Sequence, residues 1–463
     1  MIRIFRHYIS GIYLILFLME LCVFNTAFYL GDLLRDFGLG LMFYTSKGIW
    51  LPSIVFAIVM LLSATGMGLY QRVHAIGDAA LLLRILASLL VGWFALTLLF
   101  YIFPHLYEWR RIIAYALGVS LVGIMASRFL FFKYADKQSL KRRILVLGAG
   151  YRGNMICEFE TRSSHCAFRV IGYVRMGDEP IRVDPEHIFE VRTSLFEFVS
   201  TADIDEIVVA PDDRRGGIKV DEILDCKMAG YEVLDLLTFF EREAGLLRVD
   251  SLQPSWLVFS DGFRLAGVAQ VLKRWFDVLA SIFLLLIAWP FFLLTSMAIL
   301  IESGWGAPVL YRQVRVGLHG KPFKVVKFRS MRTDAEKDGR PQWARANDDR
   351  ITRVGRFIRK VRIDELPQLF NVLKGEMSFV GPRPERPEFV EKFAETIPYY
   401  AERHRVKPGI TGWAQLCYCY GSSYQDTIEK LQYDLYYIKN YSIFLDLLIM
   451  LQTIEVVIWG RGL

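Results

Sequence analysis

Four long apolar runs fill the first part of the chain, at about residues 9–30, 49–70, 81–103 and 111–132. Each is close to the roughly 20 residues that a helix needs to cross the hydrocarbon core of a bilayer. The first run carries Glu20 and is followed by three more, which argues against a cleavable signal peptide. The pattern therefore predicts four transmembrane helices within residues 1–135.

Basic residues stand at both ends of this apolar region. The first run is preceded by Arg3 and Arg6, and the last is followed by Lys133 and Lys141. Basic flanks favour the cytoplasm and four crossings return the chain to its starting side, so both ends are predicted to be cytoplasmic. Glu20 is either functional or faces another helix or the interface, and we favour the second interpretation.

After Lys141 the pattern changes to short apolar runs separated by stretches of helical periodicity. The segments ILVLG, FRVIGYV and DEIVVAPD are typical of buried strands, which predicts an α/β Rossmann-like domain over residues 136–265. At the first strand-to-helix turn, residues 148–153 spell GxGxxG, where small residues let a phosphate approach the helix N-terminus. The acidic residue expected about twenty positions later is missing from residues 169–174. The turn is thus either a nucleotide site or a structural turn of a regulatory domain, and no cofactor is assigned to it.

A fifth apolar run, residues 275–301, lies in a predicted membrane segment at 270–305. Its flanks are basic on both sides, with Lys273 before it and Arg312 after it, so both ends favour the cytoplasm. Pro290 stands in the middle of the run, where it removes a backbone donor and bends a helix. We therefore expect a re-entrant helix that enters and leaves on one face. The alternative is an ordinary crossing with a proline kink.

The composition is that of a membrane protein. Of the 463 residues, 54% are hydrophobic, and the mean hydropathy is +0.31. The length suggests about three domains. Six cysteines show no regular spacing, which predicts free thiols in a reducing compartment, and the CxC of Cys417 and Cys419 lacks the further ligands of a zinc site.

The C-terminal region, residues 306–463, begins with a strongly basic stretch. Between Arg312 and Arg362 there are sixteen Lys and Arg against five Asp and Glu, for a chain whose net charge is +7. Such a field beside a membrane attracts phosphate groups of a substrate or of lipid headgroups. Nucleic acid is not expected, because no recognition motif is present.

Two adjacent carboxylates, Asp364 and Glu365, follow the basic stretch in VRIDELPQLF. Neighbouring side chains on a helix point about 100° apart, so the pair suits two different roles. Pro367 fits a first helical turn, and the positive helix end and nearby arginines are expected to lower both pKa values. An ionised Asp364 can attack phosphorus while Glu365 binds a cation or moves protons. The alternative is that Asp364 only caps the helix.

Two later features complete the C-terminal region. Arg383 lies in GPRP, either a rigid loop that presents a planar guanidinium to phosphate oxygens or an ordinary proline turn. Residues 441–463 mix apolar residues with Asp446 and Glu455, which predicts an interfacial or packed amphipathic helix rather than a further span.

The motifs KFRSM, DELPQLFNVLKGEMSFVGPRPE and KPGITGWAQ resemble those of the bacterial sugar transferases, the monotopic phosphoglycosyl transferase superfamily. The resemblance covers residues 273–463, and the preceding spans and Rossmann-like domain resemble the large, WbaP-like subgroup and the EpsB-type exopolysaccharide sugar transferases. It implies an α-helical membrane bundle, an α/β middle domain, and a mixed, mainly α-helical, membrane-associated catalytic domain with a re-entrant helix.

The resemblance also implies a reaction and its surroundings. A sugar 1-phosphate passes from a UDP-sugar to undecaprenyl phosphate with release of UMP, through a phosphosugar ester on the enzyme and with Mg²⁺, which initiates exopolysaccharide or related glycoconjugate synthesis. The protein is then a multi-pass protein of the bacterial inner membrane whose active site faces the cytoplasm. The large subgroup suggests a homodimer, and glucose or galactose as the sugar.

Matched residue by residue, Asp364 corresponds to the family nucleophile and Glu365 to its dyad partner, both associated with Mg²⁺. Pro290 corresponds to the helix-breaking proline of the re-entrant anchor, although Trp289 stands before it where the family often has serine. The substrate-binding residues that the resemblance implies come from the basic motifs and the GPRP loop: Lys327, Arg329, Arg359 and Arg383.

Two other functions are compatible with parts of the sequence. One is a non-catalytic membrane scaffold or regulator of polysaccharide assembly, which senses a ligand through the middle domain. The other is a nicotinamide-dependent sugar-modifying enzyme whose chemistry lies in that domain. The intact Asp-Glu pair favours the transferase, while the missing acidic residue and the lack of a YxxxK motif count against the nicotinamide enzyme.

Overall fold

The computed structural model describes the chain except residues 1, 5, 10, 39–47, 71–77, 105–109, 136–140, 163–165, 192–193, 214–219, 264–266, 334–347, 419–420, 422 and 460–463. The chain divides into two compact units. The first contains Met1–Ile2 and Tyr8–Ala244, and the second contains Arg3–His7 and Gly245–Leu463.

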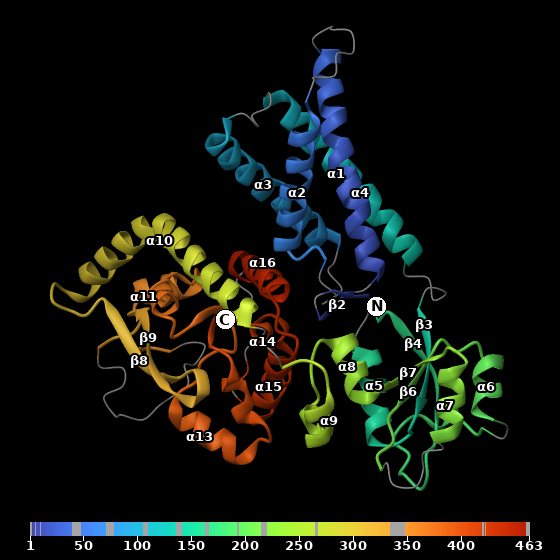
Figure 1. Cartoon of the computed structure of the whole chain (residues 1–463). Coiled ribbons are helices and arrows are strands. Elements are labelled where there is room, and N and C mark those ends of the chain that lie inside the picture. Colours follow the sequence, from blue (N-terminus) through green and yellow to red (C-terminus); the bar gives the residue numbers. More distant parts are fainter. Residues whose placement is uncertain are drawn as a thin grey trace. The chain divides into compact units, whose positions relative to one another are not determined.

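The first unit begins with apolar helices (Figure 1). Two short strands, β1 (Ile2–Ile4) and β2 (His7–Ile9), come before them in the chain. Three of the helices contain apolar stretches long enough to cross a membrane, whereas α2, with 17 residues, is shorter. The helices are α1 (Gly11–Gly38), α2 (Trp50–Gly66), α3 (Asp78–Ile102) and α4 (Arg110–Ala135).

The helices pack through an aromatic and aliphatic core that includes Phe24, Phe28 and Phe56. Glu20 of α1 is fully buried, and its carboxylate pairs with Arg128 of α4 at 2.8 Å. A buried carboxylate needs such a partner, because an unpaired charge in an apolar interior is very costly. Glu20 therefore faces another helix, as the sequence predicts.

The rest of the first unit is built around a five-stranded parallel sheet with the order β5-β4-β3-β6-β7. Its strands are β3 (Arg142–Leu147), β4 (Phe168–Val174), β5 (Ile188–Phe189), β6 (Glu206–Val209) and β7 (Glu232–Asp235). Figure 1 shows helices on both faces of the sheet. They are α5 (Tyr151–Arg162), α6 (Leu195–Thr201), α7 (Val220–Met228) and α8 (Leu236–Ala244).

The second unit is mixed but mainly helical. Its small sheets are the antiparallel pair β8 (Leu310–Val316) and β9 (Pro322–Phe328), and the parallel pair β10 (Ser378–Val380) and β11 (Gly409–Thr411). Its helices are α9 (Pro254–Phe259), α10 (Gly267–Ser303), α11 (Arg353–Lys360), α12 (Gln368–Lys374), α13 (Pro387–Thr396), α14 (Trp413–Cys417), α15 (Tyr424–Lys439) and α16 (Ile443–Trp459).

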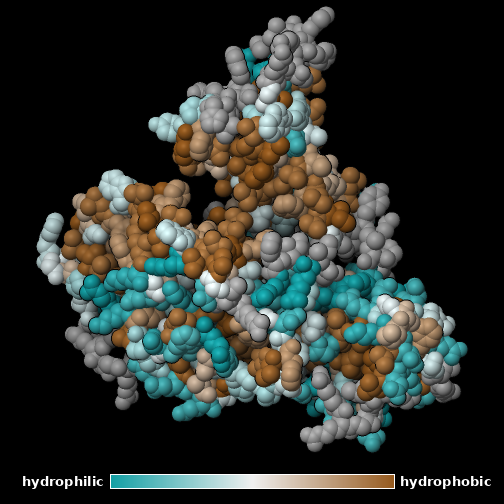
Figure 2. Space-filling model, in the orientation of Figure 1, coloured by the Kyte–Doolittle hydropathy of each residue, from teal (hydrophilic) through white to brown (hydrophobic). Residues whose placement is uncertain are grey.

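Helix α10 is the fourth candidate membrane helix among the described residues. It continues through Pro290, and Figure 1 shows it bent into an arch. Large apolar side chains such as Leu286 and Trp289 are exposed on it, and Figure 2 shows the apolar surface that these residues form. Its inward face instead carries buried polar residues, among them Lys273 and Asp277.

These polar residues attach α10 to the body of the second unit. The Lys273 ammonium lies 2.6 Å from the Asp446 carboxylate of α16. The Asp277 carboxylate accepts hydrogen bonds from the Ser378 hydroxyl at 3.1 Å and the Phe379 amide at 3.2 Å. Since Leu445 and Ile449 of α16 are also fully buried, α16 is a packed helix.

Candidate functional site

The carboxylate pair lies on a tight connection between two helices of the second unit. Helix α11 ends at Lys360, and Arg362 then adopts a left-handed conformation with φ of 58°. A 3₁₀ turn, Ile363–Glu365, follows, and Pro367 stands immediately before α12. A left-handed residue other than glycine is uncommon and is often found at functional sites. Here it turns the chain so that both carboxylates lie inside the fold.

Glu365 is surrounded by cations. Its Oε1 atom lies 2.8 Å from Lys327 Nζ, 3.1 Å from Arg383 Nη2 and 3.8 Å from Arg362 Nη1. Burial alone would raise the pKa of the Glu365 carboxyl, but Lys327, Arg383 and Arg362 outweigh burial and hold this pKa far below its usual range. Glu365 is therefore ionised, and it fixes the positions of Lys327 and Arg383.

Asp364 has the opposite environment. Its side chain is buried, and its Oδ1 atom has no hydrogen-bond partner among the described residues. Burial and the negative charge of Glu365 raise the pKa of Asp364 to about 6, although Lys327 and Arg359 act against this rise. The expectation that both pKa values fall is thus right for Glu365 and wrong for Asp364, because burial and like-charge repulsion outweigh the cations. Since Pro367, and not Asp364, occupies the position before α12, Asp364 does not cap that helix.

Two arginines of the predicted site hold buried nitrogen atoms without a protein partner. Both terminal nitrogens of Arg329, and Nη1 of Arg359, are buried and form no hydrogen bond within the part of the chain that the structure describes. Buried guanidinium groups are normally paired, so such atoms call for an explanation. Arg359 lies close enough to Asp364 to lower its pKa. Among the described residues, Arg329 forms no hydrogen bond or ion pair with the carboxylate pair. It follows β9 two residues after Lys327, and alternate residues of an extended chain share one face.

Lys327 is brought to the pair by strand β9, which α12 holds in register. Asn371 of α12 is buried and accepts a hydrogen bond from the Val326 amide at 3.0 Å. It also donates to the Lys324 carbonyl at 2.8 Å and to Glu376 at 2.7 Å. The side-chain amide thus pairs with the outer edge of β9 much as another strand would. Sequence reasoning missed Asn371, because no local pattern shows that it faces a strand.

The remaining predicted residues come from other segments of the second unit. Arg383 is in the loop after β10 and reaches Glu365, as described above. Pro290, predicted to be structural, lies inside α10. Cys419 lies outside the described residues, and Cys417 is a free cysteine.

The glycine turn of the middle domain is occupied by carboxylates of the protein itself. Asp212 accepts hydrogen bonds from the Tyr151 amide at 2.8 Å and the Arg152 amide at 2.9 Å. Glu179 accepts one from the Ala149 amide at 2.6 Å. A phosphate bound at this helix N-terminus would use the same amides. The geometry therefore favours the structural interpretation of the turn over a nucleotide site.

No group of three or more His, Cys, Asp and Glu side chains capable of holding a metal ion is present among the residues that the structure covers. Carboxylate oxygens are the ligand type that hard cations prefer, and the site offers two adjacent carboxylates. The arrangement as a whole combines a buried, unpartnered carboxylate, an ionised neighbour and four cations. It suits nucleophilic attack on a phosphorus whose oxygens the cations neutralise.

Comparison with known proteins gives the same picture. Residues 268–460 match the family model described as bacterial sugar transferase. The chain is 34% identical to the UDP-glucose:undecaprenyl-phosphate glucose-1-phosphate transferase of Escherichia coli (strain K12), over 68% of this chain and 67% of that protein. It is 32% identical to the protein of the same name from Xanthomonas campestris pv. campestris, over 72% and 71% of the two chains.

A further relative is the UDP-N-acetylgalactosamine-undecaprenyl-phosphate N-acetylgalactosaminephosphotransferase of Aeromonas hydrophila, which is 42% identical over 51% of this chain. The match spans only about half, 55%, of the length of that relative. Two relatives above 30% identity are nevertheless matched over two thirds of their length or more. With its N-terminal apolar helices and parallel-sheet domain, this chain belongs to the bacterial sugar transferase family, in its large type.

Proposed function

We propose that this protein transfers a sugar 1-phosphate from a UDP-sugar to undecaprenyl phosphate, releases UMP, and thereby initiates exopolysaccharide or related glycoconjugate synthesis. The observation that carries the proposal is the buried carboxylate of Asp364, whose Oδ1 has no partner among the described residues, beside the equally unpartnered Nη1 of Arg359. A nucleophile and an anion-binding nitrogen that lack protein partners are what a substrate diphosphate would complete. The names of the relatives support the same substrates.

In the proposed first step, a carboxylate oxygen of Asp364 attacks the phosphorus that carries the sugar. A bond from this oxygen to phosphorus forms, and the bond from phosphorus to the bridging oxygen breaks, so UMP leaves with that oxygen. An oxygen of undecaprenyl phosphate then attacks the same phosphorus and restores the Asp364 carboxylate. Glu365, which stays ionised, is suited to hold the cations in place. The family resemblance also gives it the deprotonation of the lipid phosphate, but the cations around it make it a weak base for that step.

The substrate-binding roles follow from charge and position. Arg383 and Lys327 are held 3.1 Å and 2.8 Å from Glu365 Oε1, at one side of the carboxylate pair. Arg359 and Arg329 supply buried guanidinium nitrogens that no described residue uses. Guanidinium groups match phosphate oxygens in a planar, two-pronged geometry. We assign these four residues to the diphosphate and the lipid phosphate.

Mg²⁺ is the metal that the family implies, and the residues present fit it. Mg²⁺ is commonly held by one or two carboxylates together with substrate phosphates, and Asp364 and Glu365 are the two carboxylates available here. The unpartnered Oδ1 of Asp364 is an open oxygen donor. When bound, Mg²⁺ would neutralise charge on the diphosphate.

The contacts of α10 support a membrane anchor that enters and leaves on one face. Near its start, Lys273 and Asp277 contact the second unit, and near its end the Glu302 carboxylate accepts hydrogen bonds from the Arg353 amide at 2.7 Å and the Val354 amide at 3.1 Å. A straight helix of this length would extend about 55 Å. Both ends nevertheless contact one folded unit, which a helix crossing a bilayer could not do. The active site would then lie at the cytoplasmic face of the bacterial inner membrane, with further spans at the N-terminus.

The test is an incubation of membranes containing the protein with undecaprenyl phosphate, Mg²⁺ and a panel of UDP-sugars, followed by identification of the nucleotide released. The wild type should release UMP with one donor, and Asp364→Asn should release none. Release of UDP would show ordinary glycosyl transfer and overturn the role of Asp364. UMP release that is unchanged in Asp364→Asn would exclude the proposed nucleophile.

A homodimer is a separate prediction, to be checked by the mass of the purified protein in detergent.

A further inference from the structure

The loop that carries Arg383 has few polar groups with which to hold its shape. Pro382 and Pro384 have no amide hydrogen, so the loop can be fixed mainly through its carbonyl oxygens. Three consecutive carbonyls each accept a hydrogen bond from a different element. The Pro382 carbonyl accepts from the Gly409 amide at 3.0 Å, the Arg383 carbonyl from Arg403 Nη2 at 3.0 Å, and the Pro384 carbonyl from Arg315 Nη1 at 3.1 Å.

Of the two arginines that donate to the loop, Arg403 is more deeply buried than Arg315. It belongs to the 3₁₀ helix Tyr400–Arg405, and only 7% of it is exposed. Its Nη1 donates to the Tyr400 hydroxyl at 2.8 Å, and its Nη2 donates to the Asp434 carboxylate of α15 at 2.9 Å. A buried guanidinium with three fixed acceptors has little freedom to move. The Arg383 carbonyl is therefore bound to a rigid support.

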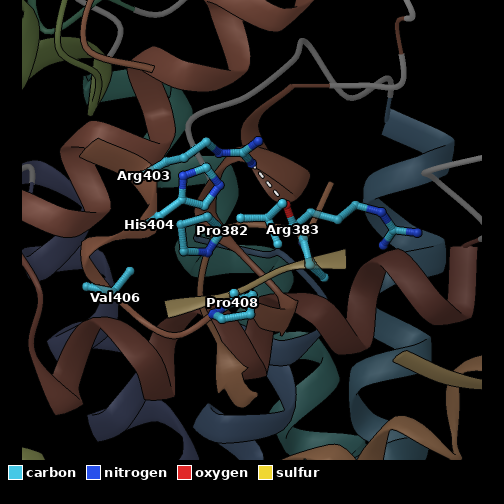
Figure 3. A pocket seen from close by; sticks show the side chains of 9 residues that line it. Pro382, Arg383, Arg403, His404, Val406 and Pro408 are labelled. Atoms are coloured by element: carbon cyan, nitrogen blue, oxygen red, sulfur yellow. Dashed lines mark hydrogen bonds between the residues drawn. The ribbon is translucent and has the colours of Figure 1, made fainter. Parts of the chain in front are cut away.

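Figure 3 shows how the side chains of Arg383 and Arg403 lie relative to each other. The Arg403 side chain reaches the backbone of Arg383, while the Arg383 side chain points away from Arg403. The cavity beside them, lined by Pro382, His404 and Pro408 among others, has a volume of about 10 Å³. That volume accommodates roughly one water molecule. Because Arg403 is buried and its terminal nitrogens donate to Tyr400, Asp434 and the Arg383 carbonyl, we infer that it contacts the loop and not a substrate.

We propose that Arg403 is a positioning residue for the transfer reaction, which acts by holding the Arg383 backbone so that the Arg383 side chain meets Glu365 and the substrate phosphate. The proposal rests on the proposed function, because it gives Arg383 a phosphate to bind. If the loop carbonyl lost its support, the fork of Arg383 would no longer be fixed 3.1 Å from Glu365. Small displacements of such groups reduce turnover strongly.

The experiment compares Arg403→Lys, Arg383→Lys and the double variant in the UMP-release assay, with thermal stability measured for each. Lysine keeps the positive charge beside Asp434 but cannot reach three acceptors at once. We expect Arg403→Lys to lower UMP release at least tenfold, and to change kcat and KM for the donor in the same proportion as Arg383→Lys. In the double variant the Arg403 change should cost less than a further twofold, because its effect passes through Arg383.

The matched control is Arg405→Ala. Arg405 lies in the same 3₁₀ helix, but its side chain is exposed and pairs with its near neighbour Glu402. It should release UMP as the wild type does. Should Arg403→Lys be too unstable to assay, Asp434→Ala removes the carboxylate that holds Arg403 Nη2, and it should show the same non-additivity with Arg383→Lys.

Three outcomes separate the possibilities. Full activity of Arg403→Lys, or a loss that multiplies independently with that of Arg383→Lys, would overturn the positioning role while leaving the transferase intact. A wild type that releases no UMP with any donor would instead count against the proposed function. A tenfold loss that vanishes in the Arg383→Lys background supports the inference.

Discussion

Asp364 is held in a state that opposes folding. Its pKa is raised from an ordinary value of 3.8 to about 6, so the folded chain binds this proton more tightly than the unfolded chain does. The resulting destabilisation is absent below the unfolded pKa, grows as pH rises, and is complete above the folded pKa. Two units of pKa correspond to roughly 3 kcal/mol.

We therefore predict that Asp364→Asn stabilises the protein near pH 7.5 by roughly 2–3 kcal/mol while it abolishes transfer. Below about pH 3 the stabilisation should disappear, because the carboxyl of the wild type is then protonated in both states. Thermal unfolding of both proteins in detergent at the two pH values tests this. Equal stability of the wild type and Asp364→Asn at pH 7.5 would show that the ionised Asp364 carboxylate does not destabilise the fold.

Arg359 opposes the rise in the pKa of Asp364. Its positive charge lowers this pKa, and its Nη1 atom forms no hydrogen bond with any described residue, so replacing Arg359 breaks no hydrogen bond of that atom. Because only the ionised carboxylate attacks phosphorus, UMP release should rise with pH through about 6 in the wild type. In Arg359→Gln the Asp364 pKa rises, so this acid limb should move to higher pH. A pH profile of UMP release measures it, and a limb that moved to lower pH would contradict the assignment.

At the scale of elements, the register of β9 on α12 decides where Lys327 lies. Asn371→Ala removes the partners of the Val326 amide and the Lys324 carbonyl, and we expect a loss of roughly 2–4 kcal/mol, since an unpaired buried polar group costs about 1–3 kcal/mol. UMP release should fall as well, because Lys327 is no longer fixed beside Glu365.

The control for Asn371→Ala is Lys374→Ala on the exposed face of the same helix. It should change stability by less than about 0.5 kcal/mol. Unfolding measurements on both variants, together with their UMP release, make the comparison. If the two variants behaved alike, the Asn371 amide would not be what holds β9 in place.

Much of this element level could be predicted from the sequence, and the exceptions share a cause. Apolar runs of membrane length and short strand-like runs are local signals, and they correctly located α1, α3 and α4 and the strands β3 and β4. The carboxylate that occupies the glycine turn could not be predicted from a local pattern, because Asp212 lies 60 residues beyond Arg152. Likewise, the opposite pKa shifts of Asp364 and Glu365 depend on burial, which adjacent letters of a sequence do not show.

At the scale of the whole molecule, the four predicted N-terminal spans and the contacts at both ends of α10 together predict on which side of the membrane the two ends of the chain lie. Tags fused before Met1 and after Leu463 should both be protected from protease in intact spheroplasts and cleaved in inverted membrane vesicles. The physical reason is that both ends of α10 contact the rest of the second unit, at Lys273 and at Glu302, which supports the proposed anchor that enters and leaves on one face. Cleavage of the C-terminal tag alone from outside would establish a true crossing.

The two faces of α10 have a consequence for how the protein is made. Its apolar face suits lipid, and its inner face supplies partners to Asp446, Ser378 and Phe328 in the second unit. Without this helix in its place, these groups would lose the partners that it supplies. Insertion is therefore a step of folding and not merely of delivery. We therefore expect the proposed transferase to become active only after α10 has reached the membrane.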